Sequence, residues 1–583
     1  MKKFKVSDNI SFAIIFGALI FYGFFISRNS VIIDGIRYFT LFDDAMISMR
    51  YAKNLTAGLG MVWNPGEYVE GYSNFLWTVW MFVLHQVPVH ASKFALLVSI
   101  SGALILVANL FLVKALSEKI SGNSPLSVNL SIVLTAFYYG IIYWTLRGME
   151  VGLLTLLVNY SLLIIFNLRE KFRALEFRIF LLLLSAIIMT RADSLIIVLA
   201  LLVSLFFAIK EDIRYKYFLR AIVTVVFVIT AQTLFRIYYY GDVLPNTFYL
   251  KIGNISYYDR FYRGFDTFKD ILLSTLLPAL IPVILYLYLS AKNFDRFKVY
   301  SLLGILATTS AYSIFVGGDS WEWMPYANRF IAVSIPATLI LMAYSIDKIF
   351  NDTGKREIPV LLLLIIIPYP LLLLFLNLIF PAKVSFVKDI IRLNNEFLII
   401  LAVVILMLFT IVLFSSQTMK EAGKMSFRRK CLALTAIITI IFLTANGWAY
   451  LQWIEKKALF VEQDSNNTRL GLKILKNTNT DTRVADVWAG NLPYFSERYS
   501  VDLLGKMDKF IAKGEPVPGF NLPGHSKWDH VYSIKNFKPD LILGLREEPS
   551  GELQKILSED YEHIRNNLFV RKQCSKFNPD IFR

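Results

Sequence analysis

Long runs of apolar residues, repeated along most of the chain, set the strongest limit on how this sequence can fold. A membrane-spanning helix needs roughly 20 such residues. About thirteen runs meet or approach that length, near residues 10–27, 93–113, 127–146, 149–167, 177–190, 194–209, 217–238, 270–290, 298–316, 329–346, 358–380, 397–415 and 431–450. Because every backbone polar group in a bilayer must be bonded within the protein, such runs become helices. The sequence therefore predicts a polytopic α-helical membrane protein with about 13 transmembrane helices.

The composition excludes an ordinary soluble protein. Hydrophobic residues make up 56% of the 583-residue chain and charged residues only 18%, against about 25% charged residues in soluble domains. The formal net charge of +16 would suit a nucleic-acid partner. Cytoplasmic loops of membrane proteins collect Lys and Arg, however, and no basic patch lies outside such loops. We therefore expect membrane lipid, and no nucleic acid, as a partner.

One short apolar run, 74–86, decides the orientation of the chain. If it does not cross the membrane, the most basic connectors all face the cytoplasm, as the positive-inside rule requires. These connectors are 114–119, 168–178, 210–216, 291–298, 347–357 and 417–430. We predict that 74–86 is a re-entrant or interfacial helix, that the N-terminus is cytoplasmic and that the C-terminus lies outside. The polar clusters of the remaining connectors then share the outer face, which indicates one outward-facing site.

The composition changes near residue 451. Residues 1–450 form the predicted transmembrane domain, with a first outer loop at 28–92. Residues 451–583 are polar, with short apolar runs between turn-forming segments, which predicts a mixed α/β extracytoplasmic domain. Cys431 and Cys574 fall on opposite faces and cannot pair, and neither has a neighbour at zinc-ligand spacing.

The first outer loop contains an acidic pair, Asp43 and Asp44, followed by apolar residues at helical spacing and by Gly58 and Gly60, where a helix would stop. One interpretation is structural: one Asp caps the helix and the other complements its dipole. The other is chemical. Adjacent carboxylates raise one pKa toward the working range, so the pair would supply a general base or bind a cation.

The surrounding motifs favour the chemical interpretation. The segment LFDDAMISMRYAKNLTAGLGMVWNPGEYVEGYSNFLWT closely resembles the start of bacterial GT-C glycosyltransferases similar to the mycobacterial terminal β-(1→2)-arabinofuranosyltransferase. The resemblance continues in GMEVGLL, TRAD, YGDVLPNTFYLK, VGGDSWEW with the following RF, AGNLPYFSERYSVDLLGKMD and PGH. Arg147, Val151 and Ala192 depart from the family pattern, where a small residue, Thr and Pro stand. These departures bear on substrate preference more than on the class of reaction.

The resemblance implies a GT-C fold in a bacterial inner membrane, and transfer of a sugar from a polyprenyl-phosphate donor to a cell-envelope glycan or glycolipid. Arabinofuranose is the sugar of the best-known example. Such a donor needs an apolar groove and a cationic clamp, for which Arg191, Lys251 and Arg329 are candidates. Asn246, Asp319 and Glu150 complete the expected donor site.

The expected acceptor site draws on the first outer loop and the C-terminal domain. Its candidates are Glu70, Tyr72, Asn491, Tyr494 and His525. Asp43 is the favoured base and Asp44 its partner, acting directly or through a divalent cation such as Mg²⁺, Mn²⁺ or Ca²⁺. No cofactor is otherwise implied.

Each assignment has a structural alternative. Arg191 and Asp193 would form an ion pair between two helices, and Lys251 and Arg329 would reach lipid head groups. Glu150 would cap a helix, Asp319 would lie in an ordinary turn, and the C-terminal domain would order the outer loops. At the level of function, the alternative is a transporter or flippase for lipid-linked sugars, without chemistry.

Overall fold

Helices dominate the chain before residue 351, and a five-stranded sheet lies in its C-terminal part. The computed structural model describes residues 6–289, 294–321, 328–351, 448–520, 522–565 and 567–582. The predicted spans at 358–380 and 397–415, nearly all of that at 431–450, and Cys431 lie outside these residues. The helices before residue 351 are α1 (Val6–Arg28), α2 (Asp43–Thr56), α3 (Phe75–His85), α4 (Phe94–Ser121), α5 (Pro125–Ala136), α6 (Tyr139–Leu146), α7 (Val151–Glu170), α8 (Ala174–Thr190), α9 (Leu195–Ala208), α10 (Glu211–Tyr240), α11 (Asn246–Ile252), α12 (Tyr257–Ile271), α13 (Leu277–Leu289), α14 (Arg296–Phe315) and α15 (Ile335–Asn351).

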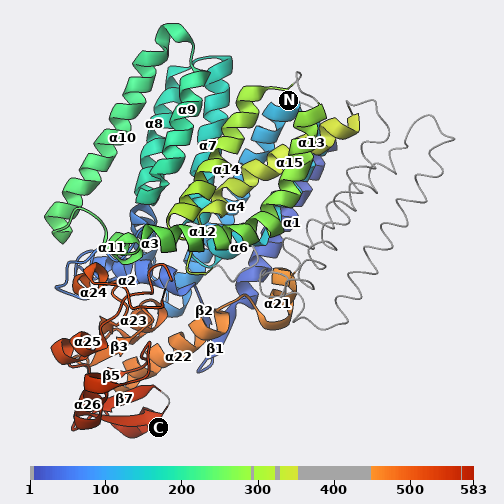
Figure 1. Ribbon diagram of the computed structural model, residues 1–583. Helices are drawn as coiled ribbons and strands as arrows, with labels where there is room; N and C mark the ends of the chain where they lie inside the picture. The colour runs from blue at the N-terminus through green and yellow to red at the C-terminus, as the bar shows by residue number, and fades with distance from the viewer. Residues whose placement is uncertain are drawn as a thin grey trace, which may run out of the picture.

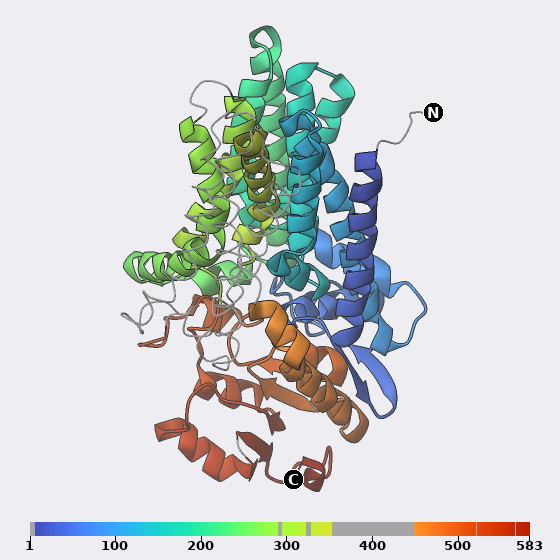
Figure 2. The same cartoon turned by 90° about the vertical axis from the view of Figure 1, so that its right-hand side faces the viewer.

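The long helices form a bundle centred on α4 and α7. Helix α4 packs against α1, α5 and α7, and α7 also contacts α8 and α9. In Figures 1 and 2 these helices run in a common direction, while α12 crosses it near the end of the bundle that faces the sheet. Six helices of the described chain are long and apolar enough to cross a membrane, or seven if one bent pair counts as a span. The protein is therefore a multi-pass membrane protein, as its sequence predicts.

Several predicted spans have a different form in the structure. The run at 127–146 is broken into α5 and α6, which meet at an angle of 49°. The break lies at Phe137 and Tyr138, because Tyr138 has an extended backbone that cannot continue a helix. Helix α9 has only 14 residues, and α3 has 11. The run at 74–86 is thus a helix too short to span, as expected, whereas the total of 13 spans stays a prediction.

The C-terminal part, residues 448–582, carries the predicted mixed sheet. Strand order is β4-β3-β5-β7-β6, with β3 parallel to β4 and β5, and with antiparallel pairs β5–β7 and β6–β7. The apolar runs RVADVW and DLILGL supply β3 and β5. The elements are α21 (Trp448–Lys456), α22 (Val461–Asn477), β3 (Arg483–Asp486), α23 (Asn491–Ser496), β4 (Tyr499–Asp502), α24 (Lys509–Lys513), α25 (His530–Phe537), β5 (Leu541–Ile542), α26 (Gly551–Asp560), β6 (Tyr561–Arg565) and β7 (Leu568–Arg571).

The first outer loop lies between the bundle and the C-terminal part (Figure 1). It begins with a hairpin of β1 (Ser30–Ile33) and β2 (Ile36–Phe39) and continues into α2. Helix α2 starts at Asp43, so the acidic pair occupies its first turn, where carboxylates favour the helix dipole. Neither carboxylate caps α2, because the preceding residue is Phe42 and no side-chain cap is formed. Helix α2 packs against α3 on one side and α23 on the other.

Candidate active site

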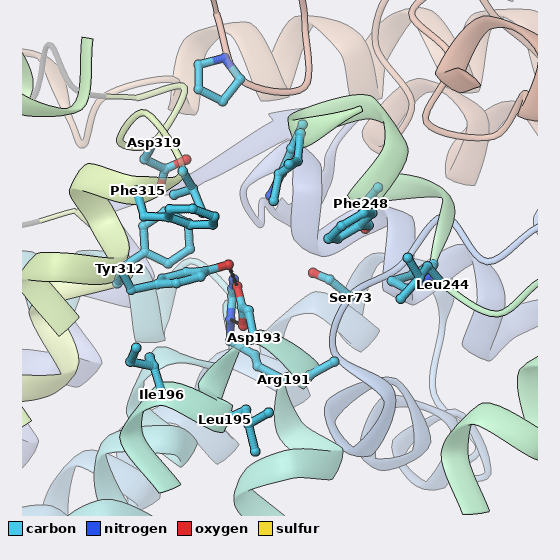
Figure 3. A pocket seen from close by; sticks show the side chains of 18 of the residues that line it. Ser73, Arg191, Asp193, Leu195, Ile196, Leu244, Phe248, Tyr312, Phe315 and Asp319 are labelled. Carbon is cyan, nitrogen blue, oxygen red and sulfur yellow. Dashed lines mark hydrogen bonds and ion pairs between the residues drawn. The ribbon is translucent and has the colours of Figure 1, made fainter. Parts of the chain in front are cut away.

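A cavity of about 420 Å³ lies beside α11, at the end of the bundle that faces the C-terminal part. We call it the α11 cavity. Its walls come from α9, α11, α14, the segment 317–320 and Pro523 of the C-terminal part. Figure 3 shows Arg191, Asp193 and Tyr312 on one side of it and Phe248, Ser73 and Leu244 on the other. Much of its lining is apolar: Leu195, Ile196, Leu199, Leu244, Pro245, Phe248, Ile252, Phe315, Val316 and Phe330.

One edge of the α11 cavity is open at the side of the bundle. Leu199 of α9 is 51% exposed, Phe315 of α14 39% and Phe248 of α11 38%. Exposed apolar side chains on a membrane bundle face hydrocarbon rather than water. The cavity can therefore admit a hydrocarbon chain laterally.

A closed ion-pair cluster forms one polar wall of the cavity. The guanidinium of Arg191 donates to Glu150 Oε1 at 2.5 Å, and to both oxygens of Asp193 at 2.8 and 2.5 Å. Tyr312 donates to Asp193 at 2.9 Å (Figure 3), and Asn74 donates to Glu150 at 2.9 Å. The predicted ion pair between α8 and α9 is therefore present. Arg191 also lines the cavity, so the structural and the chemical interpretation do not exclude each other.

Lys251 is the exception among the cations of this cavity. It lies half-buried on α11 and makes no ion pair or side-chain hydrogen bond within the described ranges. Burial, together with the nearby charges of Arg329 and Arg191, lowers its pKa to about 8. An ammonium group that is partly desolvated and lacks a carboxylate partner is suited to an anionic ligand.

A second network connects the cavity to the acidic pair. Arg329 forms a bidentate pair with Asp319, both contacts being 2.6 Å, and its Nη1 donates to Asp44 at 2.9 Å. Lys506 donates to the other oxygen of Asp44 at 2.8 Å. Burial alone would raise the pKa of Asp44, but Lys506 and then Arg329 outweigh it and hold that pKa well below its usual value. Asp44 is thus an ionised carboxylate between two cations.

Asp43 has a different environment. It is 3% exposed, and its carboxylate accepts from the backbone N–H groups of Gly490 at 3.1 Å and Asn491 at 2.8 Å. Burial raises its pKa to about 6. Position 490 must be glycine, since a Cβ there would lie 1.9 Å from the carbonyl oxygen of Asp43. Asp43 therefore fastens α2 to the C-terminal part.

The expected acceptor residues are mostly buried in contacts between the first outer loop and its neighbours. Glu70 accepts from Arg236 at 2.7 Å, and the hydroxyl of Tyr72 meets that of Tyr240 at 3.1 Å. Tyr494 bonds His85 at 3.1 Å. These three residues are each 5% exposed or less, so the structure places them in packing positions.

Asn491, His525 and Asn246 complete the predicted set. Asn491 is fully buried and donates to Asp464 at 3.1 Å. His525 lies 3.2 Å from the hydroxyl of the cavity-lining Ser320, and burial lowers its pKa to about 3, so it is neutral near pH 7. Asn246, expected in the donor site, does not line the cavity; it bonds carbonyls of the segment 505–508 instead.

The acidic pair does not offer a ready cation site. Within the described ranges there is no group of three or more His, Cys, Asp or Glu side chains that could hold a metal. The oxygens of Asp44 already bind Lys506 and Arg329, and those of Asp43 bind N–H groups. A divalent ion would have to displace these partners.

Comparison with solved structures identifies the fold. The structure matches that of ArnT from Cupriavidus metallidurans bound to undecaprenyl phosphate, with a TM-score of 0.53 and 11% sequence identity, over 97% of this chain and 98% of that one. The chain has the ArnT fold. The archaeal oligosaccharyltransferase AglB from Archaeoglobus fulgidus also matches, with a TM-score of 0.44 and 9% identity, over 84% of this chain and 64% of that one. No protein-family model and no curated protein matches the sequence.

Within this ArnT fold, the contacts of three basic residues near the site were not predicted from the sequence. Lys506 binds Asp44, Arg236 lines the cavity, and Arg147 forms a buried ion pair with Asp464 of α22. A signal existed for Arg236, the single charged residue in the last 20 residues of the long helix α10. Lys506 lies in a motif that the sequence analysis had used, but nothing in the sequence pairs it with Asp44.

Proposed function

We propose that the protein is a membrane glycosyltransferase that takes its sugar from a polyprenyl-phosphate donor bound in the α11 cavity. One observation carries this proposal: the cavity combines an apolar wall that is open at the side of the bundle with Lys251, a cation that has no carboxylate partner among the described residues. A polyprenyl phosphate has the same two parts, a long hydrocarbon chain and an anionic head group.

The donor phosphate would contact Lys251 directly. Arg191 and Arg329 lie close enough to depress the pKa of Lys251, so they add positive potential while their carboxylate partners hold them in place. The prenyl chain would follow Leu199, Phe248 and Phe315 out of the bundle. Stabilising the departing phosphate is the main task of such a site, and one preorganised contact of this kind contributes about 3–4 kcal/mol.

The acceptor hydroxyl would approach from the side of Asp44. Its oxygen attacks the anomeric carbon while its proton passes to the Asp44 carboxylate, the bond from that carbon to the phosphate oxygen breaks, and polyprenyl phosphate leaves. Asp44 is the better placed of the two aspartates to orient the hydroxyl, since its side chain is 15% exposed and Asp43 is enclosed by N–H groups. We therefore propose Asp44 as the reacting carboxylate and Asp43 as a docking residue, the reverse of the assignment favoured from sequence.

The finer predictions extend this proposal. We place the protein in a bacterial inner membrane, with about 13 spans, a cytoplasmic N-terminus and residues 451–583 as an extracytoplasmic domain following the transmembrane domain 1–450. The acceptor is a cell-envelope glycan or glycolipid, and arabinofuranose is the candidate sugar. These assignments are supported by the sequence motifs and by the positive-inside rule.

The test is a release assay with purified protein in lipid nanodiscs. A polyprenyl-phosphate arabinofuranose donor is supplied with and without an envelope-glycan acceptor, and free polyprenyl phosphate is measured. We expect release that depends on the acceptor. If vesicles containing the protein instead move the donor between leaflets and release none, the protein is a flippase and the proposal is wrong.

A further inference from the structure

Helix α11 has two faces with different partners. Thr247, Phe248 and Lys251 line the α11 cavity. Asn246 and Leu250 are buried, at 4% and 1% exposure, and α11 packs against α24 of the C-terminal part. The helix that presents Lys251 is therefore held between the cavity and the C-terminal part.

Asn246 fastens the beginning of α11. Its side-chain amide donates to the carbonyl oxygens of Gly505 and Lys506, both at 2.9 Å, and of Asp508 at 3.3 Å. Its backbone N–H donates to the carbonyl oxygen of Glu70 at 3.0 Å. The side chain of Asn246 is thus hydrogen-bonded to the backbone of one turn in the C-terminal part. Lys506, which binds Asp44, belongs to the same turn.

Lys527 fastens the middle of α11. The residue is 1% exposed, and its ammonium group donates to the carbonyl oxygens of Tyr249 on α11, at 3.1 Å, and of Ala512 on α24, at 2.8 Å. A buried ammonium group is costly unless its hydrogen bonds are made. Moving α11 away from α24 would break one of these bonds in an interior that offers no replacement.

The turn before Lys527 runs along the side chain of Lys251. A Cβ built on Gly524 would lie 3.6 Å from Cγ and 3.7 Å from Cε of Lys251. Gly524 has φ +77, so glycine suits this turn, and the neighbouring Pro523 lines the cavity. The C-terminal part therefore contacts the backbone of α11 and lies alongside the stem of its lysine.

We propose that the C-terminal part completes the donor site, with Lys527 and Asn246 as positioning residues that hold Lys251 toward the phosphate. This inference rests on the proposed function. It gives the C-terminal part a role in donor binding, whereas the sequence assigned it to the acceptor. Because linkage is reciprocal, donor binding also strengthens the docking of the C-terminal part.

The test measures binding of undecaprenyl phosphate to the full-length protein in nanodiscs. Lys527→Met keeps the length of the side chain and removes its donors; we expect about tenfold weaker binding, corresponding to about 1.4 kcal/mol. Lys527→Arg, which retains donors, restores most of the affinity. Lys535→Met is the matched control, since Lys535 is half exposed and pairs with Glu552 on the surface of the same part.

A double-mutant cycle separates positioning from general destabilisation. If Lys527 acts through Lys251, Lys251→Met with Lys527→Met binds no more weakly than Lys251→Met alone, whereas independent losses would add. Additive losses, or wild-type affinity in Lys527→Met, would overturn the inference. If Lys527→Met does not fold, Asn246→Leu serves in the same cycle. Absence of binding by the wild-type protein would refute the proposed function itself, so the two failures are distinguishable.

Discussion

The α11 cavity and the contact between α2 and the C-terminal part both contain buried charges, yet they use them differently. We call the second region the α2 junction; it comprises Thr40–Asp43 and Arg147 on the membrane side and Asp464, Gly490 and Asn491 on the other. In the junction both carboxylates accept from donors across the contact: Asp43 from Gly490 and Asn491, and Asp464 from Arg147, with a further bond from Asn491 on its own side. In the cavity, Lys251 has no such partner within the part of the chain that the structure describes.

The presence or absence of a charge partner distinguishes residues suited to holding the two parts of the protein together from residues suited to binding a ligand. A buried charge costs free energy unless it is paired, so a charge paired across a contact stabilises that contact, whereas an unpaired charge beside a cavity is a candidate for ligand binding. Both regions carry motifs of the same family resemblance. Motif membership therefore does not distinguish a residue that binds substrate from one that holds the fold around it.

The largest expected effect comes from breaking the α2 junction at Arg147. Arg147 and Asp464 are each 1% exposed, so Arg147→Met leaves a buried carboxylate without its charge partner. We expect a loss of about 3–5 kcal/mol in the free energy of unfolding, measured by denaturation of the purified protein. Arg169→Met is the control: its pair with Asp295 is about 40% exposed and should contribute about 1 kcal/mol or less. Equal losses in the two variants would contradict the distinction.

The next effect tests the cavity. Lys251→Met removes the proposed phosphate contact but breaks no ion pair described in the structure, so turnover should fall about 10²–10³-fold with little change in the free energy of unfolding. Turnover is measured as acceptor-dependent release of polyprenyl phosphate. A variant that unfolds as readily as Arg147→Met would show that Lys251 is a structural residue.

The acidic pair provides the third test, because Asp43 belongs to the α2 junction whereas Asp44 belongs to the network that leads to the α11 cavity. Asp43→Asn places a donor group against the N–H groups of Gly490 and Asn491, so the free energy of unfolding should fall by about 1–3 kcal/mol. Asp44→Asn keeps Lys506 and Arg329 and should retain binding of undecaprenyl phosphate while it loses turnover. Turnover and the free energy of unfolding, measured on the same preparations of each variant, distinguish the two roles. Loss of turnover in a stable Asp43→Asn protein would make Asp43 the base.

The sequence predicted the features that depend on neighbouring residues and did not predict the contacts between residues far apart in the chain. Apolar runs, the short helix at 74–86 and the mixed sheet follow from local patterns, and the structure contains them. The pairing of Asp44 with Lys506 joins residues 462 positions apart, and that of Arg147 with Asp464 joins residues 317 apart. No local spacing encodes such contacts. The break in the 127–146 run was not predicted for a related reason. The sequence stays apolar through the bend, so its length and hydropathy are those of a single span.

The smallest expected effect concerns pH and again separates the two regions. Lys251 must be protonated to bind an anion, and its pKa is lowered to about 8. Affinity for undecaprenyl phosphate should therefore be full below that value and fall as the pH rises through it, by about tenfold between pH 7 and pH 9, since one pH unit corresponds to 1.36 kcal/mol. The phosphate, whose second pKa is about 6, is already ionised throughout this range.

Lys251→Arg gives the matched control for this pH dependence. A guanidinium stays charged in the whole range, so its binding curve should be flat between pH 7 and pH 9. The acidic pair contributes nothing to such a profile, because Asp43, with a pKa raised to about 6, and Asp44, whose pKa is well below its usual value, are both ionised above pH 7. A flat profile in the wild-type protein would mean that Lys251 does not meet the phosphate. A decline that persists in Lys251→Arg would assign the titration to another group and place the anion elsewhere in the cavity.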